Sequence, residues 1–120
     1  MLHTQQQIIG KSKEKLACQY LEEKGFKLIE KNYYCRRGEI DLIMRDQDSL
    51  VFVEVRYRKN ANFGSALESV NTKKQKCLIF SAEHYLQQTH TPLAARFDVV
   101  AISGSDTNPV IDWVKNAFGT

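Results

Sequence analysis

The segment from residue 36 to residue 58, RRGEIDLIMRDQDSLVFVEVRYR, constrains the fold more than any other part of the sequence. Apolar and polar side chains alternate in two short runs, 38–44 and 51–57, which is typical of the two strands of a hairpin. A register that faces apolar side chains with apolar ones gives three pairs: Ile40 with Val55, Leu42 with Val53, and Met44 with Val51. The turn then falls at Gln47-Asp48, which is short enough for a tight hairpin.

The same register places acidic side chains in the middle of both strands. Asp41 faces Glu54, and Glu39 faces Arg56. Two facing carboxylates, with Cβ atoms about 5 Å apart, destabilise a strand pair, and at an effective dielectric of about 20 they repel by about 3 kcal/mol. A shared proton, a neighbouring Arg or Lys, or a divalent cation would offset this repulsion. Mg²⁺ suits the geometry, because it binds one or two carboxylates together with water and phosphate.

A purely structural explanation of the acids stays open. Arg56 and Arg58 lie on the same face and could form a ladder of solvated ion pairs with them. Glu14 lies on the flank of the apolar stripe of the first expected helix, so it can point at the sheet. It could also pair with a neighbouring lysine, Lys11 or Lys15, at the surface.

The rest of the chain predicts an α/β domain with a mixed sheet. The expected elements are a helix over 10–25, a strand over 26–35, the hairpin, a long helix from Ser65 to Gln88, a strand over 94–103 and a short edge strand over 109–114. Ser65 and Glu68 would form the capping box of the long helix. The nearly continuous apolar run of 94–103 suits a strand covered on both faces and parallel to the strand before the helix.

Lys74 and Gln75 fall within the apolar arc of the long helix. A lysine there can extend to the edge of the core, and a glutamine can bond to the backbone. A lysine aimed at a carboxylate cluster is also what phosphate chemistry would use.

Composition bounds the class of protein. At 120 residues we expect one domain over 1–120, and the three cysteines lack the spacing of a disulfide framework or a zinc site. No segment reads as a signal peptide or a membrane span, so we expect a cytoplasmic protein without a membrane partner. The net charge of +3 permits nucleic-acid binding but does not indicate it.

The order of an acid on a helix, G-E-I-D on one strand and E-x-[KR] on the next resembles the PD-(D/E)XK nuclease superfamily. More closely, the runs GEIDLI, VFVEVRYR, FGSALESV, RFDVVAI and WVKNAF resemble the YraN family over about residues 10–118. That is a family of small uncharacterised bacterial proteins classed as Holliday-junction-resolvase-like. The resemblance implies a restriction-endonuclease-like core in the order α-β-β-β-α-β.

The resemblance also assigns roles to the acids. It implies that Asp41 and Glu54 are the metal-binding acids of the two strand motifs and that Glu14 is the acid of the first helix. Glu39 would be an extra acid of the G-E-I-D form. The implied chemistry is hydrolysis of a phosphodiester by water activated with one or two Mg²⁺ or Mn²⁺ ions. Asp98 is typical of the family, and we expect it to pair with Arg96 or cap a neighbouring group.

The sequence departs from the superfamily pattern at Arg56, which stands where the motif has a lysine. A guanidinium stays protonated in proteins, so it can stabilise negative charge but cannot exchange a proton. Three explanations stay open: Lys74, with Gln75 beside it, replaces the motif lysine from the helix; the metal alone suffices; or the protein binds nucleic acid without turnover.

Basic residues of the hairpin and the long helix could contact nucleic acid if they gather near the acids. The candidates are Arg36, Arg37, Arg56, Arg58, Lys73 and Lys74. Phe63-Gly64-Ser65 would add the anion site of a helix N-terminus. No pattern codes for base readout, so we expect recognition of DNA structure, such as junctions and flaps, and a homodimer if two strands are cut together. A protein-interaction domain whose acids only form ion pairs is the third hypothesis.

Overall fold

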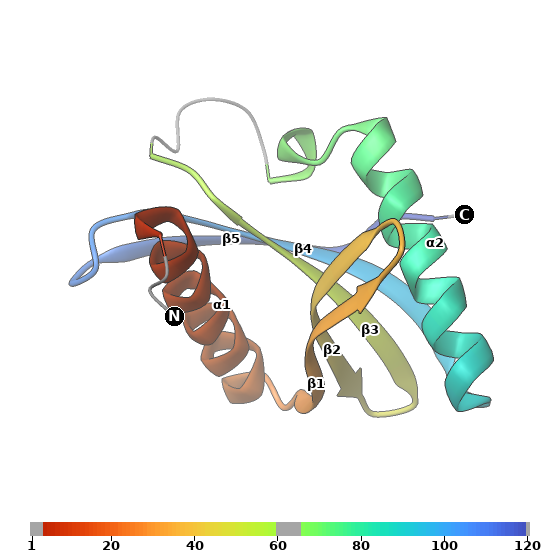
Figure 1. Cartoon of the computed structure of the whole chain (residues 1–120). Coiled ribbons are helices and arrows are strands. Elements are labelled where there is room, and N and C mark those ends of the chain that lie inside the picture. The colour runs from red at the N-terminus through yellow and green to blue at the C-terminus, as the bar shows by residue number, and fades with distance from the viewer. Residues whose placement is uncertain (1–3, 60–65, 120) are drawn as a thin grey trace.

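The computed structural model describes residues 4–59 and 66–119 (Figure 1). Its elements are α1 (Gln5–Glu23), β1 (Lys27–Cys35), β2 (Gly38–Asp46), β3 (Ser49–Tyr57), the 3₁₀ helix η1 (Leu67–Ser69), α2 (Thr72–Thr89), β4 (Ala94–Gly104) and β5 (Pro109–Phe118). The strands form a sheet in the order β1-β2-β3-β4-β5, with β3 and β4 parallel and the other neighbours antiparallel. This is the predicted α/β fold, a restriction-endonuclease-like core with a mixed sheet flanked by helices.

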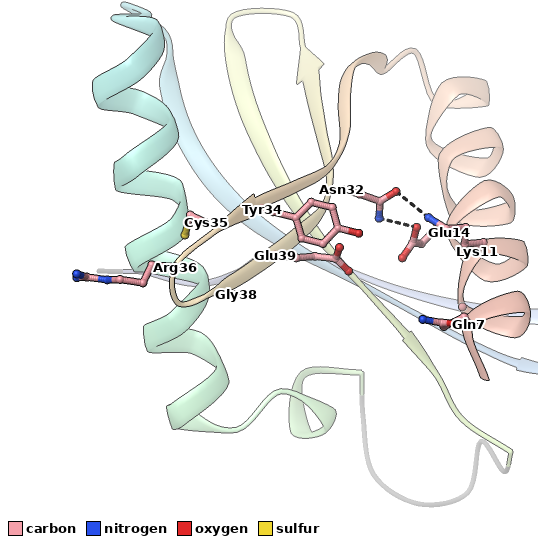
Figure 2. Close-up of a pocket in the computed structure, with 10 residues that line it drawn as sticks. Gln7, Lys11, Glu14, Asn32, Tyr34, Cys35, Arg36, Gly38 and Glu39 are labelled. Carbon is pink, nitrogen blue, oxygen red and sulfur yellow. Dashed lines mark hydrogen bonds between the residues drawn. The ribbon is translucent and has the colours of Figure 1, made fainter. Parts of the chain in front are cut away.

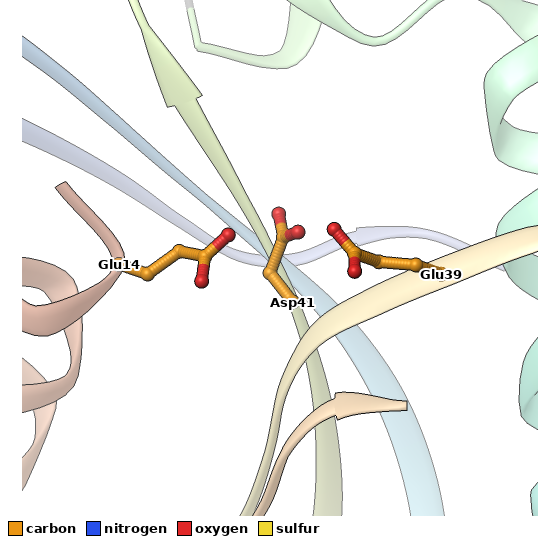
Figure 3. Close-up of side chains that lie close together, drawn as sticks. All are labelled: Glu14, Glu39 and Asp41. Carbon is orange, nitrogen blue, oxygen red and sulfur yellow. The ribbon is translucent and has the colours of Figure 1, made fainter. Parts of the chain in front are cut away.

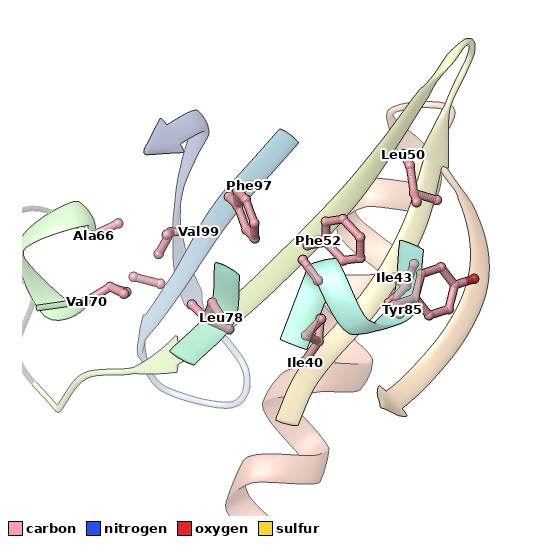
Figure 4. Packing of buried hydrophobic residues seen from close by; sticks show 12 residues of the cluster. Ile40, Ile43, Leu50, Phe52, Ala66, Val70, Leu78, Tyr85, Phe97 and Val99 are labelled. Carbon is pink, nitrogen blue, oxygen red and sulfur yellow. The ribbon is translucent and has the colours of Figure 1, made fainter. Parts of the chain in front are cut away.

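The two helices cover opposite faces of the sheet, and each face has its own core (Figure 1). Phe52 of β3 packs against Tyr85 of α2 on one face, with ring centroids 5.9 Å apart (Figure 4). On the other face Ala17 and Leu21 of α1 pack over Val53. The central strands β3 and β4 are therefore covered on both sides, as the apolar run of β4 predicts. None of the described helices is long and apolar enough to cross a membrane.

The hairpin has the predicted register in its outer half and departs from it at Asp41. Two predicted pairs, Leu42 with Val53 and Met44 with Val51, are confirmed, and the turn lies at Gln47-Asp48, where Gln47 has a φ of 54°. The predicted pair of Ile40 with Val55 is wrong. Ile40 packs in the core under α2, whereas Leu42, Met44 and Val55 belong to the core under α1, so the alternation of faces shifts by one residue at Asp41.

The reason for the shift is a side-chain hydrogen bond. The backbone N–H of Val55 donates to Asp41 Oδ2 at 2.8 Å, so the carboxylate occupies the place where the next partner of the ladder would be. The regular pairing of β2 with β3 accordingly runs from Leu42–Val53 to Asp46–Ser49. This irregularity, which resembles a β-bulge, redirects the Asp41 side chain toward α1.

Both helices begin at other residues than the sequence predicts. Helix α1 begins at Gln5 rather than at residue 10, because Thr4 and Gln7 form a capping box. Helix α2 begins at Thr72, because the Asn71 side chain accepts a hydrogen bond from the backbone N–H of Lys74 at 2.8 Å and caps the helix there. Of the predicted capping box, Glu68 lies in η1 and Ser65 lies outside the described residues.

Strand β5 continues to Phe118, four residues beyond the expected edge strand. The Phe118 ring stacks on the Phe97 ring of β4 with centroids 4.8 Å apart, which extends the core under α2. Asp98 holds this end of the sheet together. Its fully buried carboxylate accepts hydrogen bonds from Arg96, from the Trp113 indole and from the backbone N–H of Asn116, each at 3.0 Å. The expected pairing of Asp98 with Arg96 is therefore confirmed.

Candidate metal centre

Three carboxylates converge between α1 and β2 (Figure 3). Glu14 extends from α1, and Glu39 and Asp41 extend from β2, with one oxygen atom of each within 4.8 Å of the others. Asp41 is buried, with 8% of its surface exposed, and the two glutamates are half-buried. The shift of strand faces at Asp41 creates this arrangement, because it turns Asp41 toward the helix that carries Glu14.

Asp41 is the most perturbed group of the cluster. Burial raises the pKa of its carboxyl, and the charge of Glu54 and a hydrogen bond with Glu54 raise it further, to about 10. The hydrogen bond from the Val55 N–H opposes this rise without cancelling it. Without a cation, Asp41 therefore holds a proton at neutral pH. A divalent cation would replace that proton, since it favours the carboxylate form.

Glu54 connects the acids to the basic side of the site. It is buried, with 3% of its surface exposed, and its Oε2 lies 3.5 Å from Lys74 Nζ and 3.7 Å from Arg56 Nη1. Lys74 thus reaches from α2 to the acids of the sheet, as one of the sequence explanations requires. Both basic side chains are more than one third exposed, so these ion pairs are weak contributors to stability, about 0–1 kcal/mol each.

The contacts of the other predicted site residues are with groups other than the acids of the cluster. Gln75 donates its amide to the Val70 carbonyl at 3.0 Å, so it holds the start of α2, and its catalytic role stays a prediction. Arg36 and Arg37 stack over the Phe80 ring of α2 at 5.7 and 5.1 Å from its centroid. Arg58 pairs with Asp112 of β5 at 3.6 Å.

The predicted basic set is therefore divided among three places. Arg56 and Lys74 lie at the acids, Arg36 and Arg37 at the tip of the β1–β2 turn, and Arg58 against β5. Lys73 is exposed on α2 next to Lys74. The predicted anion site at Phe63-Gly64-Ser65 lies outside the described residues.

Asn32 of β1 is a site residue that the sequence reasoning missed. Its Nδ2 donates to Glu14 Oε1 at 2.9 Å, and its Oδ1 accepts from Lys11 Nζ at 3.4 Å. Its backbone has a φ of 51°, in the left-handed region that asparagine tolerates better than most residues. An asparagine in the middle of a strand is uncommon, and this was the signal in the sequence.

A groove of about 700 Å³ opens beside the acids, between α1 and the end of β1 (Figure 2). Its lining includes Glu14, Asn32, Tyr34 and Glu39, together with the basic side chains of Lys11 and Arg36. The hydrogen bond and the charge of Glu39 raise the pKa of the Tyr34 phenol, which places the two side chains in contact. The acids are therefore open to a ligand that approaches from this side.

The fold and the acid cluster define a class of protein: an α/β protein with a restriction-endonuclease-like core and a carboxylate cluster at its second strand. Residues 13–102 match the model of the uncharacterised protein family UPF0102, and the chain belongs to that family, which is the YraN family.

The chain is similar in sequence to UPF0102 proteins of several bacteria over most of their length. The chain is 53% identical to a UPF0102 protein of Psychromonas ingrahamii, over 88% of this chain and 84% of that protein. It is 49% identical to a UPF0102 protein of Nitrosococcus oceani, over 91% of this chain and 90% of the relative. A relative in Herminiimonas arsenicoxydans is also 49% identical, over 96% and 90% of the two chains.

Proposed function

We propose that this protein is a metal-dependent endonuclease that hydrolyses phosphodiesters in DNA, including branched DNA. The observation that carries the proposal is the convergence of Glu14, Glu39 and Asp41 within 4.8 Å, beside a buried Glu54 that is paired with Lys74. Three acids crowded at a half-buried place destabilise one another. An arrangement of this kind is expected where a bound cation offsets the repulsion.

The residues present fit Mg²⁺ or Mn²⁺. Both ions bind carboxylate oxygens, and the sequence offers no histidine or cysteine among the acids that converge here. Glu14, Glu39 and Asp41 would hold the ion, and Glu54 adjoins Asp41. When bound, the ion would lower the pKa of an attacking water and neutralise charge on the phosphate.

Two basic side chains beside the acids, Arg56 and Lys74, supply positive charge for the phosphate and a group that can exchange a proton. Arg56 stays protonated, so it can hold negative charge that develops on the phosphate. Lys74 carries an ammonium that can orient a water molecule and exchange a proton. Its position 3.5 Å from Glu54 supports its use in place of the lysine that the superfamily motif has at position 56.

The test combines metal binding with cleavage. Calorimetry with Mg²⁺ and Mn²⁺ would compare the wild type with Asp41→Asn, and Asp48→Asn would be the matched control, because Asp48 is exposed in the turn at the other end of the hairpin. The same samples would be incubated with labelled four-way junction, flap and linear duplex. We expect the wild type and Asp48→Asn to bind metal and cut, and Asp41→Asn to do neither. If none of the three proteins bound metal, and none cut DNA when Mg²⁺ or Mn²⁺ was added, the proposal would be rejected.

Arg56 favours a second candidate function, a nucleic-acid-binding module that has lost turnover. Lys74→Ala and Arg56→Lys separate the two. If Lys74 carries the proton transfer, Lys74→Ala loses cleavage while it keeps metal binding, and Arg56→Lys keeps both. If the wild-type protein bound branched DNA but cut no substrate with Mg²⁺ or Mn²⁺, the second candidate function, a nucleic-acid-binding module, would be supported. Sedimentation with and without a junction would test the homodimer that cutting of two strands requires.

A further inference from the structure

An exposed aromatic ring stands in the groove beside the acids (Figure 2). Tyr34 has 68% of its surface exposed, the largest fraction among the large apolar and aromatic side chains that stand out from the described surface. Its ring extends from β1 toward α1, above Glu39. The neighbouring Tyr33 instead packs edge-on against Tyr85, with centroids 5.1 Å apart. Packing in the core therefore accounts for an aromatic residue at Tyr33. The exposed face of the Tyr34 ring can instead receive a flat ligand.

The opposite wall of the groove contains a glycine that the fold does not need. Gly10 lies in the second turn of α1, where a glycine costs about 1 kcal/mol relative to alanine. A Cβ atom added at Gly10 would meet nothing within 4 Å, so neither close packing nor a left-handed backbone requires glycine there. What the missing side chain does provide is width in the groove.

We propose that this groove binds an unpaired nucleotide next to the scissile phosphate, with the base stacked on Tyr34 and the helix backbone at Gly10 close against it. The inference rests on the proposed nuclease function, and it adds the substrate class: DNA with a single-stranded segment at the cut. Stacking of a base on an exposed aromatic ring is the common mode of binding single strands and tolerates every base. A paired base keeps its faces inside the duplex and cannot offer one to Tyr34.

The charges around the groove fit this occupant. Two acids, Glu14 and Glu39, and two bases, Lys11 and Arg36, line the groove, so its formal charges balance and a neutral base meets no net charge there. Asn32, also in the wall, adds an amide beside the base. Arg36, which also lines the groove, and Arg37 both lie over the Phe80 ring, where the strand could continue as it leaves the groove.

The test measures binding separately from cutting. Fluorescence anisotropy in EDTA would compare a labelled single strand, a flap and a blunt duplex. Tyr34→Ala should weaken binding of the single strand and the flap by about 5- to 100-fold, and Tyr34→Phe, which keeps the ring, should stay within about twofold of the wild type. Tyr57→Ala is the control, because Tyr57 is exposed but is not among the residues that line the groove.

Gly10→Ala separates stability from binding. It should raise the midpoint of thermal unfolding by about 2–5 °C and weaken binding of the single strand by about three- to tenfold. Ser12→Ala, at an exposed helix position outside the groove, should stabilise α1 without a change in binding. A more stable Gly10→Ala protein with wild-type affinity would overturn the inference. The inference would also be overturned if Tyr34→Ala weakened binding of the duplex and of the single strand equally. The same holds if Tyr57→Ala weakened binding of the single strand as much as Tyr34→Ala does.

Cleavage with Mg²⁺ then distinguishes this inference from the proposed function. Tyr34-dependent binding of single strands by a protein that cuts nothing supports the groove and rejects the nuclease. Cutting of all three substrates at equal rates, unchanged in Tyr34→Ala, supports the nuclease and rejects the groove.

Discussion

Asp41 and Asp98 are both buried aspartates in the sheet, and they differ in what surrounds them. Asp98 accepts hydrogen bonds from the Arg96 guanidinium, the Trp113 indole and the Asn116 backbone N–H, so its charge is matched inside the protein. Asp41 accepts one backbone hydrogen bond and otherwise faces Glu14, Glu39 and Glu54. Burial alone therefore does not mark a functional acid. The informative feature is a buried charge whose neighbours raise its free energy instead of lowering it.

The largest effect is expected at Asp98. Asp98→Asn removes the charge that Arg96 and the Trp113 indole depend on, and it should lower the free energy of unfolding by about 3 kcal/mol, with or without Mg²⁺. Urea unfolding measures this. Asp46→Asn is the matched control, because Asp46 also contacts Arg96 but is less buried, and its loss should be smaller. If Mg²⁺ restored the stability that Asp98→Asn loses, Asp98 would be a metal ligand and not a structural acid.

At Asp41, in contrast, substitution by Asn is expected to raise the free energy of unfolding of the metal-free protein above neutral pH. Because the pKa of Asp41 rises from 3.8 to about 10 on folding, the folded state binds a proton that the unfolded state has released. The stability of the wild type should therefore fall as pH rises between these values. Asp41→Asn removes this dependence, so it should stabilise the protein at pH 8, and the difference from the wild type should disappear as pH falls toward 4. Unfolding curves in EDTA across this range are the measurement. A destabilised Asp41→Asn protein at pH 8 would contradict it.

Mg²⁺ should stabilise the wild type and leave Asp41→Asn unchanged. At ten times its dissociation constant a ligand that binds the folded state adds about 1.4 kcal/mol. Thermal unfolding with Mg²⁺, and with K⁺ at equal ionic strength as the control, separates binding at the acids from general screening. Equal stabilisation of the two proteins would place the ion elsewhere.

The smallest effect is expected at Asn32, which acts through Glu14. Asn32→Gly keeps the left-handed backbone and removes the amide that holds Glu14, so Mg²⁺ affinity should fall by about tenfold with little change in stability. Asn32→Ala should lose the same affinity and, in addition, about 1 kcal/mol of stability, because alanine is strained at a φ of 51°. Calorimetry and urea unfolding of the two variants separate the side-chain role from the backbone role.

The sequence predicted those parts of the fold that local patterns determine. The alternation in the hairpin gave the register of Leu42 with Val53, and the apolar run of 94–103 gave the parallel strand β4. The misses arose where a side chain competes with the backbone. The Asp41 carboxylate takes the N–H of Val55 and shifts the strand, and the Asn71 side chain sets the start of α2. No periodicity reports such contacts, because each depends on one hydrogen bond formed in three dimensions.

The candidate site was predictable in its members more than in its geometry. Asp41, Glu54 and Lys74 are near one another as the motif spacing suggested. The sequence did not show that Glu39 joins Glu14 and Asp41 within 4.8 Å, since that depends on the shift at Asp41. Nor did it single out Asn32, whose contact with Glu14 joins residues 18 positions apart.

The acids and their basic partner come from four elements: Glu14 from α1, Glu39 and Asp41 from β2, Glu54 from β3 and Lys74 from α2. The two helices dock on opposite faces of the sheet, so the hairpin alone assembles only part of the constellation. A chain still folding, or one whose helix α1 has locally unfolded, lacks Glu14 and therefore the third acid. In the proposed nuclease the metal centre would therefore be complete only in the fully folded molecule, and local unfolding of α1 would remove one of its ligands before the rest of the fold is lost.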